Sequence, residues 1–175
     1  HHEQMDYYNG AGVDITFMGL GELGEDGSVN STKMGTRCTG AGGFIDITQN
    51  AKKVVFLGTF TARGAEYKFD NGKLNIVKEG KIRKMVKQVA QLSFNGPMAR
   101  KKGQEVVIIT ERAVFELCEK GVLLTEIAPG IDLQTQILDM MEFKPFISPD
   151  LKLMDEKLFI QDGPFGLRLK ELEER

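Results

Sequence analysis

The stretch with the clearest chemical potential is rich in glycine and covers residues 39–47. Three of four consecutive positions are glycine and an apolar residue follows them: Gly40, Ala41, Gly42, Gly43 and Phe44. Glycines at this density let the backbone approach a ligand closely and point successive N–H groups into one concavity, which can hold an oxyanion or a phosphate. A helix beginning after the glycines would add its own free N–H groups. The simpler interpretation is a tight turn between two core elements.

The motif Gly40-Ala41-Gly42-Gly43-Phe44 resembles the GxGGF signature of the family I coenzyme A transferases, and the single-chain acetate and propionate CoA-transferases are the most similar group. Four further stretches match in the expected order: residues 12–20, 26–30, 109–115 and 125–131. Five ordered matches are more specific than one loop. The resemblance implies a three-layer α/β/α domain with a mainly parallel sheet, whose site lies between this domain and an N-terminal partner domain.

The resemblance also implies a chemistry, the exchange of CoA between short-chain carboxylic acids. The substrates would be an acyl-CoA thioester and a carboxylate, with no bound cofactor. A glutamate attacks the acyl-CoA to give a mixed anhydride and then a glutamyl-CoA thioester, and the steps reverse on a second acid. Each tetrahedral intermediate carries an oxyanion that backbone N–H groups must stabilise. By resemblance, the oxyanion and CoA-binding residues are Gly40, Ala41, Gly42, Gly43 and Phe44.

The glutamate nucleophile of such enzymes stands in a Glu-x-Gly context, upstream of the segment that matches residues 12–20. Glu3 does not fit that context, because Gln4 and Met5 follow it. We therefore expect residues 1–175 to be the C-terminal, β-subunit-like portion of a CoA-transferase, with no catalytic residue of its own and inactive alone. The remainder of that chain would be its partner, in a homo-oligomer. A non-catalytic CoA-binding or assembly module is the alternative.

Composition excludes several other classes of protein. The 175 residues are 41% hydrophobic and 27% charged, as in a globular domain, and the net charge of −2 creates no field that recruits nucleic acid or an anionic membrane. The apolar runs are far shorter than the ~20 residues of a membrane-spanning helix. We expect a cytoplasmic protein.

Few side chains suit other kinds of catalysis. Both histidines are terminal, so a Ser-His-Asp, Cys-His or histidine metal site has no internal imidazole, and no metal is expected. Cys38 and Cys118 are expected to be reduced thiols, and Cys38 to be a small buried residue. Three carboxylates beside expected elements are assigned structural roles: Asp46, Glu111 and Glu126.

The hydrophobic pattern predicts a mixed α/β fold. Buried strands are expected at residues 13–18, 53–60 and 105–110, with a short helix over 44–50, and this arrangement of glycine loop and helix is typical of an α/β ligand crevice. Antiparallel hairpins are expected at residues 65–79 and 113–127. The remaining expectations are a turn-rich entry over 1–12, a loop over 99–103, a helix over 131–141 capped by Asp132, extended coil over 143–149, and an exposed helix or frayed tail over 151–175.

Two patterns leave other functions open. Residues 19–24 satisfy G-x-G-x-x-G, the signature of dinucleotide-dependent oxidoreductases, but turn residues follow where that site needs a helix. A sugar-phosphate isomerase-like protein would share the fold, but the absence of an internal histidine speaks against it. Five cations form a cluster that could contact CoA phosphates, although we favour a solvated edge that blocks aggregation: Lys78, Lys81, Arg83, Lys84 and Lys87.

Overall fold

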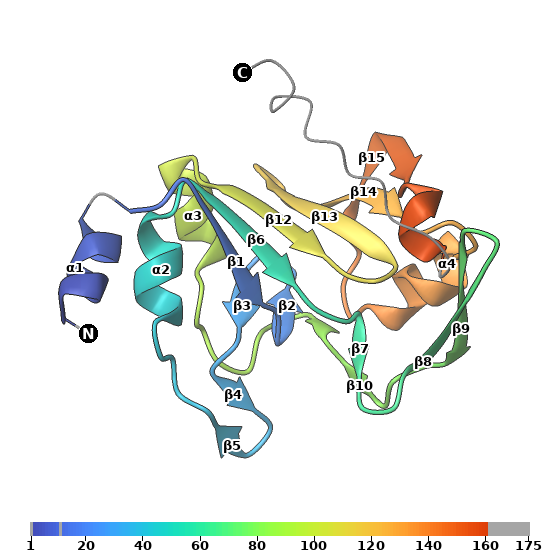
Figure 1. Ribbon diagram of the computed structural model, residues 1–175, viewed down its shortest axis with the longest axis horizontal. Helices are drawn as coiled ribbons and strands as arrows, with labels where there is room; N and C mark the ends of the chain where they lie inside the picture. Colours follow the sequence, from blue (N-terminus) through green and yellow to red (C-terminus); the bar gives the residue numbers. More distant parts are fainter. Residues whose placement is uncertain (1, 11, 161–175) are drawn as a thin grey trace.

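A six-stranded sheet organises the computed structural model, which describes residues 2–10 and 12–160 (Figure 1). In order across the sheet, the strands are β1 (Ile15–Gly19), β6 (Lys53–Leu57), β12 (Glu105–Ile109), β13 (Ala113–Cys118), β14 (Gly121–Ile127) and β15 (Phe146–Leu153). Strands β1, β6 and β12 run parallel, β12, β13 and β14 run antiparallel in turn, and β15 is parallel to β14. The expected mixed α/β fold with a mainly parallel sheet is confirmed, as is the hairpin at residues 113–127.

Short strands form four smaller sheets. Three strands, β2 (Glu22–Gly24), β3 (Val29–Asn30) and β11 (Met85–Val86), make one of them. The others are strand pairs: β4 (Lys33–Met34) with β5 (Arg37–Cys38), β7 (Thr61–Ala62) with β10 (Ile82–Arg83), and β8 (Glu66–Asp70) with β9 (Lys73–Lys78). The β8–β9 pair confirms the hairpin expected at residues 65–79, and the positive φ angles of Asn71 and Gly72 suit its tight turn.

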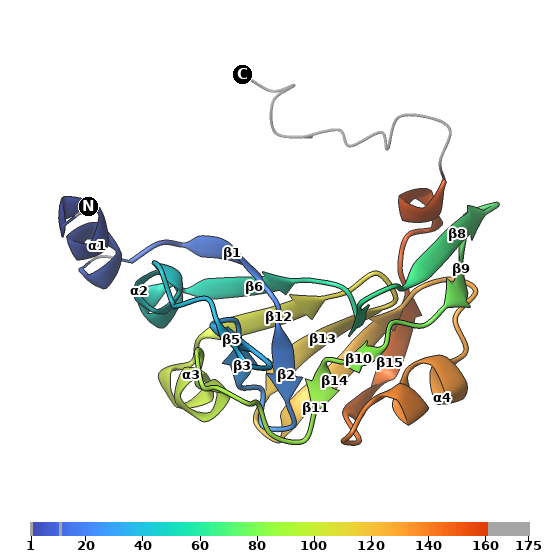
Figure 2. The ribbon, with the colours of Figure 1, turned by 90° about the horizontal axis from the view of Figure 1, so that it is seen from below.

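Helices are short. They are α1 (His2–Asn9), α2 (Phe44–Asn50), α3 (Gly96–Lys102) and α4 (Leu133–Gln136), with the 3₁₀ turns η1 (Leu138–Met140) and η2 (Glu156–Phe159). Figure 2 shows α3, α4 and the β2-β3-β11 sheet on one side of the main sheet. The helix expected over residues 44–50 is confirmed. No helix within residues 2–10 and 12–160 combines the length and apolarity needed to cross a membrane.

Two expected loops are helices instead. The turn-rich entry was wrong because the chain is helical up to Asn9, whose side chain donates a hydrogen bond to Asp46 Oδ1 at 2.9 Å and so ties α1 to α2. The basic loop over residues 99–103 was wrong because Asn95 caps the first turn of α3 by accepting from the Met98 N–H. Gly103, with a φ of 69°, ends that helix in the left-handed conformation.

The helix expected over residues 131–141 is broken. Asp132 does cap its start, because its side chain accepts from the Thr135 N–H at 2.7 Å, but α4 ends at Gln136. Ile137 leaves the helical region with φ −122° and ψ −68°, and its side chain is fully buried. The tertiary packing that buries Ile137 thus overrides the local preference for a continuous helix.

The coil expected over residues 143–149 and the tail expected from residue 151 were also wrong in part, because β15 occupies Phe146–Leu153. Pro149 is tolerated within β15 because this strand lies at the edge of the sheet and its register against β14 shifts between Leu124 and Glu126. The charged end of the tail, residues 168–175, lies outside the described residues, as do residues 161–167.

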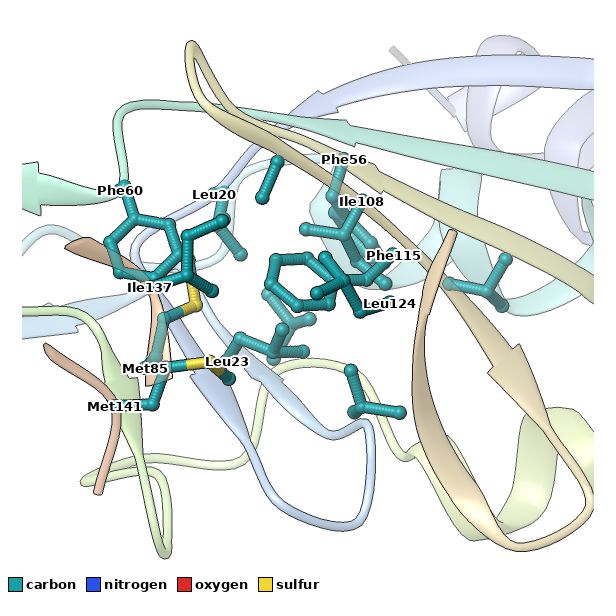
Figure 3. Close-up of a cluster of buried hydrophobic side chains, with 14 of the residues drawn as sticks. Leu20, Leu23, Phe56, Phe60, Met85, Ile108, Phe115, Leu124, Ile137 and Met141 are labelled. Atoms are coloured by element: carbon teal, nitrogen blue, oxygen red, sulfur yellow. The ribbon is translucent and has the colours of Figure 1, made fainter. Parts of the chain in front are cut away.

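The core lies between the main sheet and the layer formed by α3, α4 and the β2-β3-β11 sheet (Figures 2 and 3). Alternate residues of the central strands point into it, among them Phe56, Ile108 and Phe115, which are fully buried. The opposite face of β1 and β6 carries apolar side chains that are exposed: Ile15 by 46%, Phe17 by 62% and Leu57 by 42%. This part of the sheet is therefore apolar on both faces.

Arg112 is fully buried at the end of β12, and no local pattern in the sequence indicated this. Its guanidinium donates to Glu79 Oε1 at 2.6 Å, to Glu79 Oε2 at 3.0 Å and to Glu111 Oε1 at 2.8 Å, and lies 4.8 Å from the Phe60 ring centroid. Burial disfavours its charge, but the two glutamates outweigh burial and hold its pKa above the usual value. Glu111 Oε2 also accepts from the Phe60 N–H at 2.8 Å, so the cluster joins the segments that follow β6 and β12.

Replacing Arg112 with methionine is expected to lower the free energy of unfolding by about 3 kcal/mol, because it leaves the partly buried carboxylates of Glu79 and Glu111 without their cation. Urea unfolding followed by circular dichroism measures this change. The control is Lys52→Met, which removes an exposed ion pair with Asp14 and should leave the urea midpoint unchanged. Equal midpoints for the two variants would contradict a stabilising role for the Arg112 cluster.

Candidate functional site

The glycine loop has a backbone conformation that explains its composition. Gly40 and Gly42 have φ angles of 80° and 53°, in the left-handed region that favours glycine. A Cβ built at either position would meet no heavy atom within 4 Å. The two glycines are therefore required by the path of the backbone, and the space beside them is open.

Four successive N–H groups in this loop have no hydrogen-bond acceptor among the residues that the structure describes. Within the described part of the chain, those of Gly40, Ala41, Gly42 and Gly43 donate to no acceptor, and the first hydrogen bond after them runs from the Phe44 N–H to the Ala41 carbonyl at 3.0 Å. Gly40 and Gly42 are exposed, and Ala41 and Gly43 are partly buried. An array of unpaired backbone donors is suited to an anionic group or to an oxygen that develops negative charge.

Phe44 anchors this loop to the core. Its side chain is only 6% exposed and stacks on Phe56 of β6, with ring centroids 5.9 Å apart. Of the five residues assigned to the site from the sequence, Gly40, Ala41, Gly42 and Gly43 present free N–H groups. The side chain of Phe44 instead positions the loop.

Hydrogen bonds place the loop at the carboxyl end of the parallel strands. Thr39, at the start of the loop, donates to the Thr32 carbonyl through its N–H at 2.9 Å and through its hydroxyl at 3.1 Å. The neighbouring Ser31 hydroxyl donates to the carbonyl of Gly19, the last residue of β1, at 3.3 Å. Ligands of open α/β sheets bind at this end of the strands.

The same edge holds a lysine that the sequence did not single out. Lys84 is 7% exposed, and a Cβ built on Gly58, directly after β6, would lie 3.0 Å from its Nζ. Burial lowers the pKa of Lys84, and the charge of Glu111 offsets part of that effect. The solvated-edge interpretation is therefore wrong for Lys84, although it suits Lys78, which pairs with Glu66 at 3.2 Å, and the exposed Lys81.

A large cleft of the described chain lies elsewhere. It has a volume of about 1200 Å³, and its lining includes Lys87, Arg100, Lys120 and Phe146. Lys120 lies in the turn between β13 and β14. Because β13 runs antiparallel to β12, this turn lies beside the amino end of β12. The cleft is therefore at the opposite end of the sheet from the glycine loop. None of the five loop residues lines it, and it does not contribute to the site described above.

Other candidate sites find no support in the geometry. Residues 19–24 pass through β2 into a turn and then β3, so the helix that a dinucleotide site requires does not follow them. Cys38 is exposed rather than buried, because it ends the outlying β4–β5 hairpin. Within residues 2–10 and 12–160, no group of three or more His, Cys, Asp or Glu residues could hold a metal ion.

The mainly parallel sheet and the elements around it are found in a solved CoA-transferase structure. The chain superimposes on the acyl-CoA transferase YdiF from E. coli O157:H7, described as a thioester complex with CoA, with a TM-score of 0.92 and 47% sequence identity. The match covers 95% of this chain and 32% of that structure.

Sequence comparison identifies homologues that are named as CoA-transferases. The chain is 47% identical to the acetate CoA-transferase YdiF of Escherichia coli (strain K12) over 168 residues, which are 96% of this chain and 32% of that protein. It is 48% identical to the caffeate CoA-transferase of Acetobacterium woodii over 164 residues, 91% of this chain and 31% of that protein. No protein-family model matches the chain. The chain thus spans about a third of the length of its CoA-transferase relatives, and the resemblance to such enzymes is confirmed.

Gly58→Ala is expected to lower the free energy of unfolding by about 1–3 kcal/mol, because the new methyl group would crowd the Leu20 backbone and Lys84 Nζ. Gly19→Ala is the matched control at the same edge, since a Cβ there would meet nothing within 4 Å. Thermal unfolding compares the two variants. Equal stability would contradict the close approach of Leu20, Gly58 and Lys84.

Proposed function

We propose that this chain is the C-terminal, β-subunit-like part of a single-chain acyl-CoA:carboxylate CoA-transferase that exchanges CoA between short-chain acids. The observation that carries the proposal is the row of four N–H groups, at residues 40–43, that donate to no acceptor among the described residues and follow a segment bonded to the end of β1. The similarity to acetate and caffeate CoA-transferases supports the reaction class. CoA enters as the thioester substrate rather than as a bound cofactor.

In this proposal the glycine loop stabilises the oxyanion of each tetrahedral intermediate. A glutamate carboxylate attacks the acyl-CoA carbonyl and expels the CoA thiolate, which then attacks the mixed anhydride, releases the first acid and leaves a glutamyl-CoA thioester. The second acid reverses these steps. At each addition, negative charge develops on a carbonyl oxygen, and in this proposal the N–H groups of Gly40, Ala41, Gly42 and Gly43 donate to it.

The glutamate nucleophile is proposed to come from the remainder of the enzyme. The apolar side chains of Ile15, Phe17 and Leu57, exposed on the outer face of β1 and β6, support a covering partner segment there. This chain matches about a third of the length of its relatives, so the rest of a relative's length could supply such a segment. A homo-oligomer in the cytoplasm remains a prediction.

The test is CoA exchange between acetyl-CoA and labelled propionate, measured on this chain alone and on the protein with its upstream sequence restored. Exchange is expected only in the restored protein. If neither form exchanged CoA, the transferase proposal would fail for these substrates, and a non-catalytic CoA-binding module would replace it. Exchange by the short chain alone would refute the external nucleophile.

Gly42→Ala in the restored protein is expected to lower kcat by about 10²-fold, because a methyl group next to the free N–H groups would displace the oxyanion from its proposed donors. Gly35→Ala is a matched control for backbone strain: its φ of 60° is close to that of Gly42, and its Cβ would also meet nothing within 4 Å. Gly35 lies outside the loop, so its variant should keep the original kcat. Equal losses in the two variants would show that strain, and not the loop, limits catalysis.

A further inference from the structure

Lys84 is a buried cation whose charge no described residue neutralises directly. Its residue exposure is 7%, yet its Nζ makes no hydrogen bond and no ion pair within 4.0 Å in residues 2–10 and 12–160. Glu111 is the nearby acidic group, but Oε1 of Glu111 accepts from Arg112 and Oε2 from the Phe60 N–H. Because most of the side chain is buried and Nζ keeps some access to solvent, an anion that reaches Nζ would offset part of the cost of burying its charge.

The location of Nζ indicates which anion. Gly58 follows β6, Leu20 follows β1 and Glu111 follows β12, so the ammonium lies where three parallel strands end. The start of the glycine loop is linked to the same place. Thr39 donates to the Thr32 carbonyl, and the neighbouring Ser31 donates to the carbonyl of Gly19, the residue before Leu20. The lysine and the start of the glycine loop therefore lie at the same edge of the sheet.

We propose that Lys84 binds the carboxylate of the acid that accepts CoA. The inference rests on the proposed function, in which the loop N–H groups stabilise the oxyanion while a second group must hold the incoming carboxylate. An ammonium supplies a charge-assisted hydrogen bond to a carboxylate and regains in that bond part of what its own burial costs. Lys84 is thus a binding residue that selects anionic acids.

The kinetic test uses the full-length protein with propionyl-CoA as donor and acetate as acceptor. Lys84→Met keeps the length of the side chain without its charge and is expected to raise the KM for acetate roughly 10- to 100-fold, the loss typical of one charged hydrogen bond. The KM for propionyl-CoA should change less than about 2-fold. The control is Lys81→Met, an exposed lysine on the same segment, which should leave both constants unchanged.

The alternative is that the Lys84 ammonium pairs with the carboxylate of the nucleophilic glutamate and not with that of the acceptor acid. In that case Lys84→Met would slow formation of the enzyme–CoA thioester from acyl-CoA alone and leave the KM for acetate unchanged. That result would overturn the proposal. If the unaltered protein showed no CoA exchange, the proposed function would fail instead, so the two failures are distinguishable.

A second measurement needs no variant, in case Lys84→Met does not fold. Amine labelling of the unaltered full-length protein with trinitrobenzenesulfonate, followed by peptide mass spectrometry, reports the modification of each lysine. Acetate should slow the labelling of Lys84 and not that of Lys81, and chloride at the same ionic strength should slow neither. Labelling of Lys84 that is insensitive to acetate would overturn the proposal.

Discussion

The buried ion cluster of Arg112 with Glu79 and Glu111 is the interaction on which the candidate site depends. Arg112 follows β12, Glu79 follows β9, and Glu111 accepts from the backbone of Phe60, so one cation fixes three segments near the carboxyl end of the sheet. The cluster engages both oxygens of Glu111 and so leaves Lys84 without a direct partner. An interaction that stabilises the fold thereby leaves a second charge available for a ligand.

The glycine loop shows a complementary division of roles. Backbone geometry requires Gly40 and Gly42, and Phe44 fastens the loop to the core by stacking on Phe56. Free donors in the loop offer stabilisation of negative charge but no nucleophile. This explains why a chain with such a loop would need a glutamate from another segment to act as a CoA-transferase, as we propose.

Local patterns in the sequence predicted much of the fold. The apolar runs of β6 and β12, the Asn71-Gly72 turn and the glycine loop each have a physical signal within a few residues. Long-range packing decided the rest: burial of Ile137 ended α4, and the edge position of β15 allowed Pro149 within a strand. The burial of Lys84 and Arg112 could not be predicted because nothing local distinguishes these residues from exposed neighbours such as Lys81 and Arg83. Their burial arises from segments far apart in the chain.

The most direct test of the account locates the covalent intermediate. The full-length protein would be treated with acetyl-CoA, reduced with borohydride to convert the glutamyl thioester to a stable alcohol, digested and sequenced by mass spectrometry. We expect one modified glutamate, outside residues 1–175, and its loss when acetate is added in excess before reduction. A modified glutamate within residues 1–175, or no modified glutamate in a protein that exchanges CoA, would contradict it.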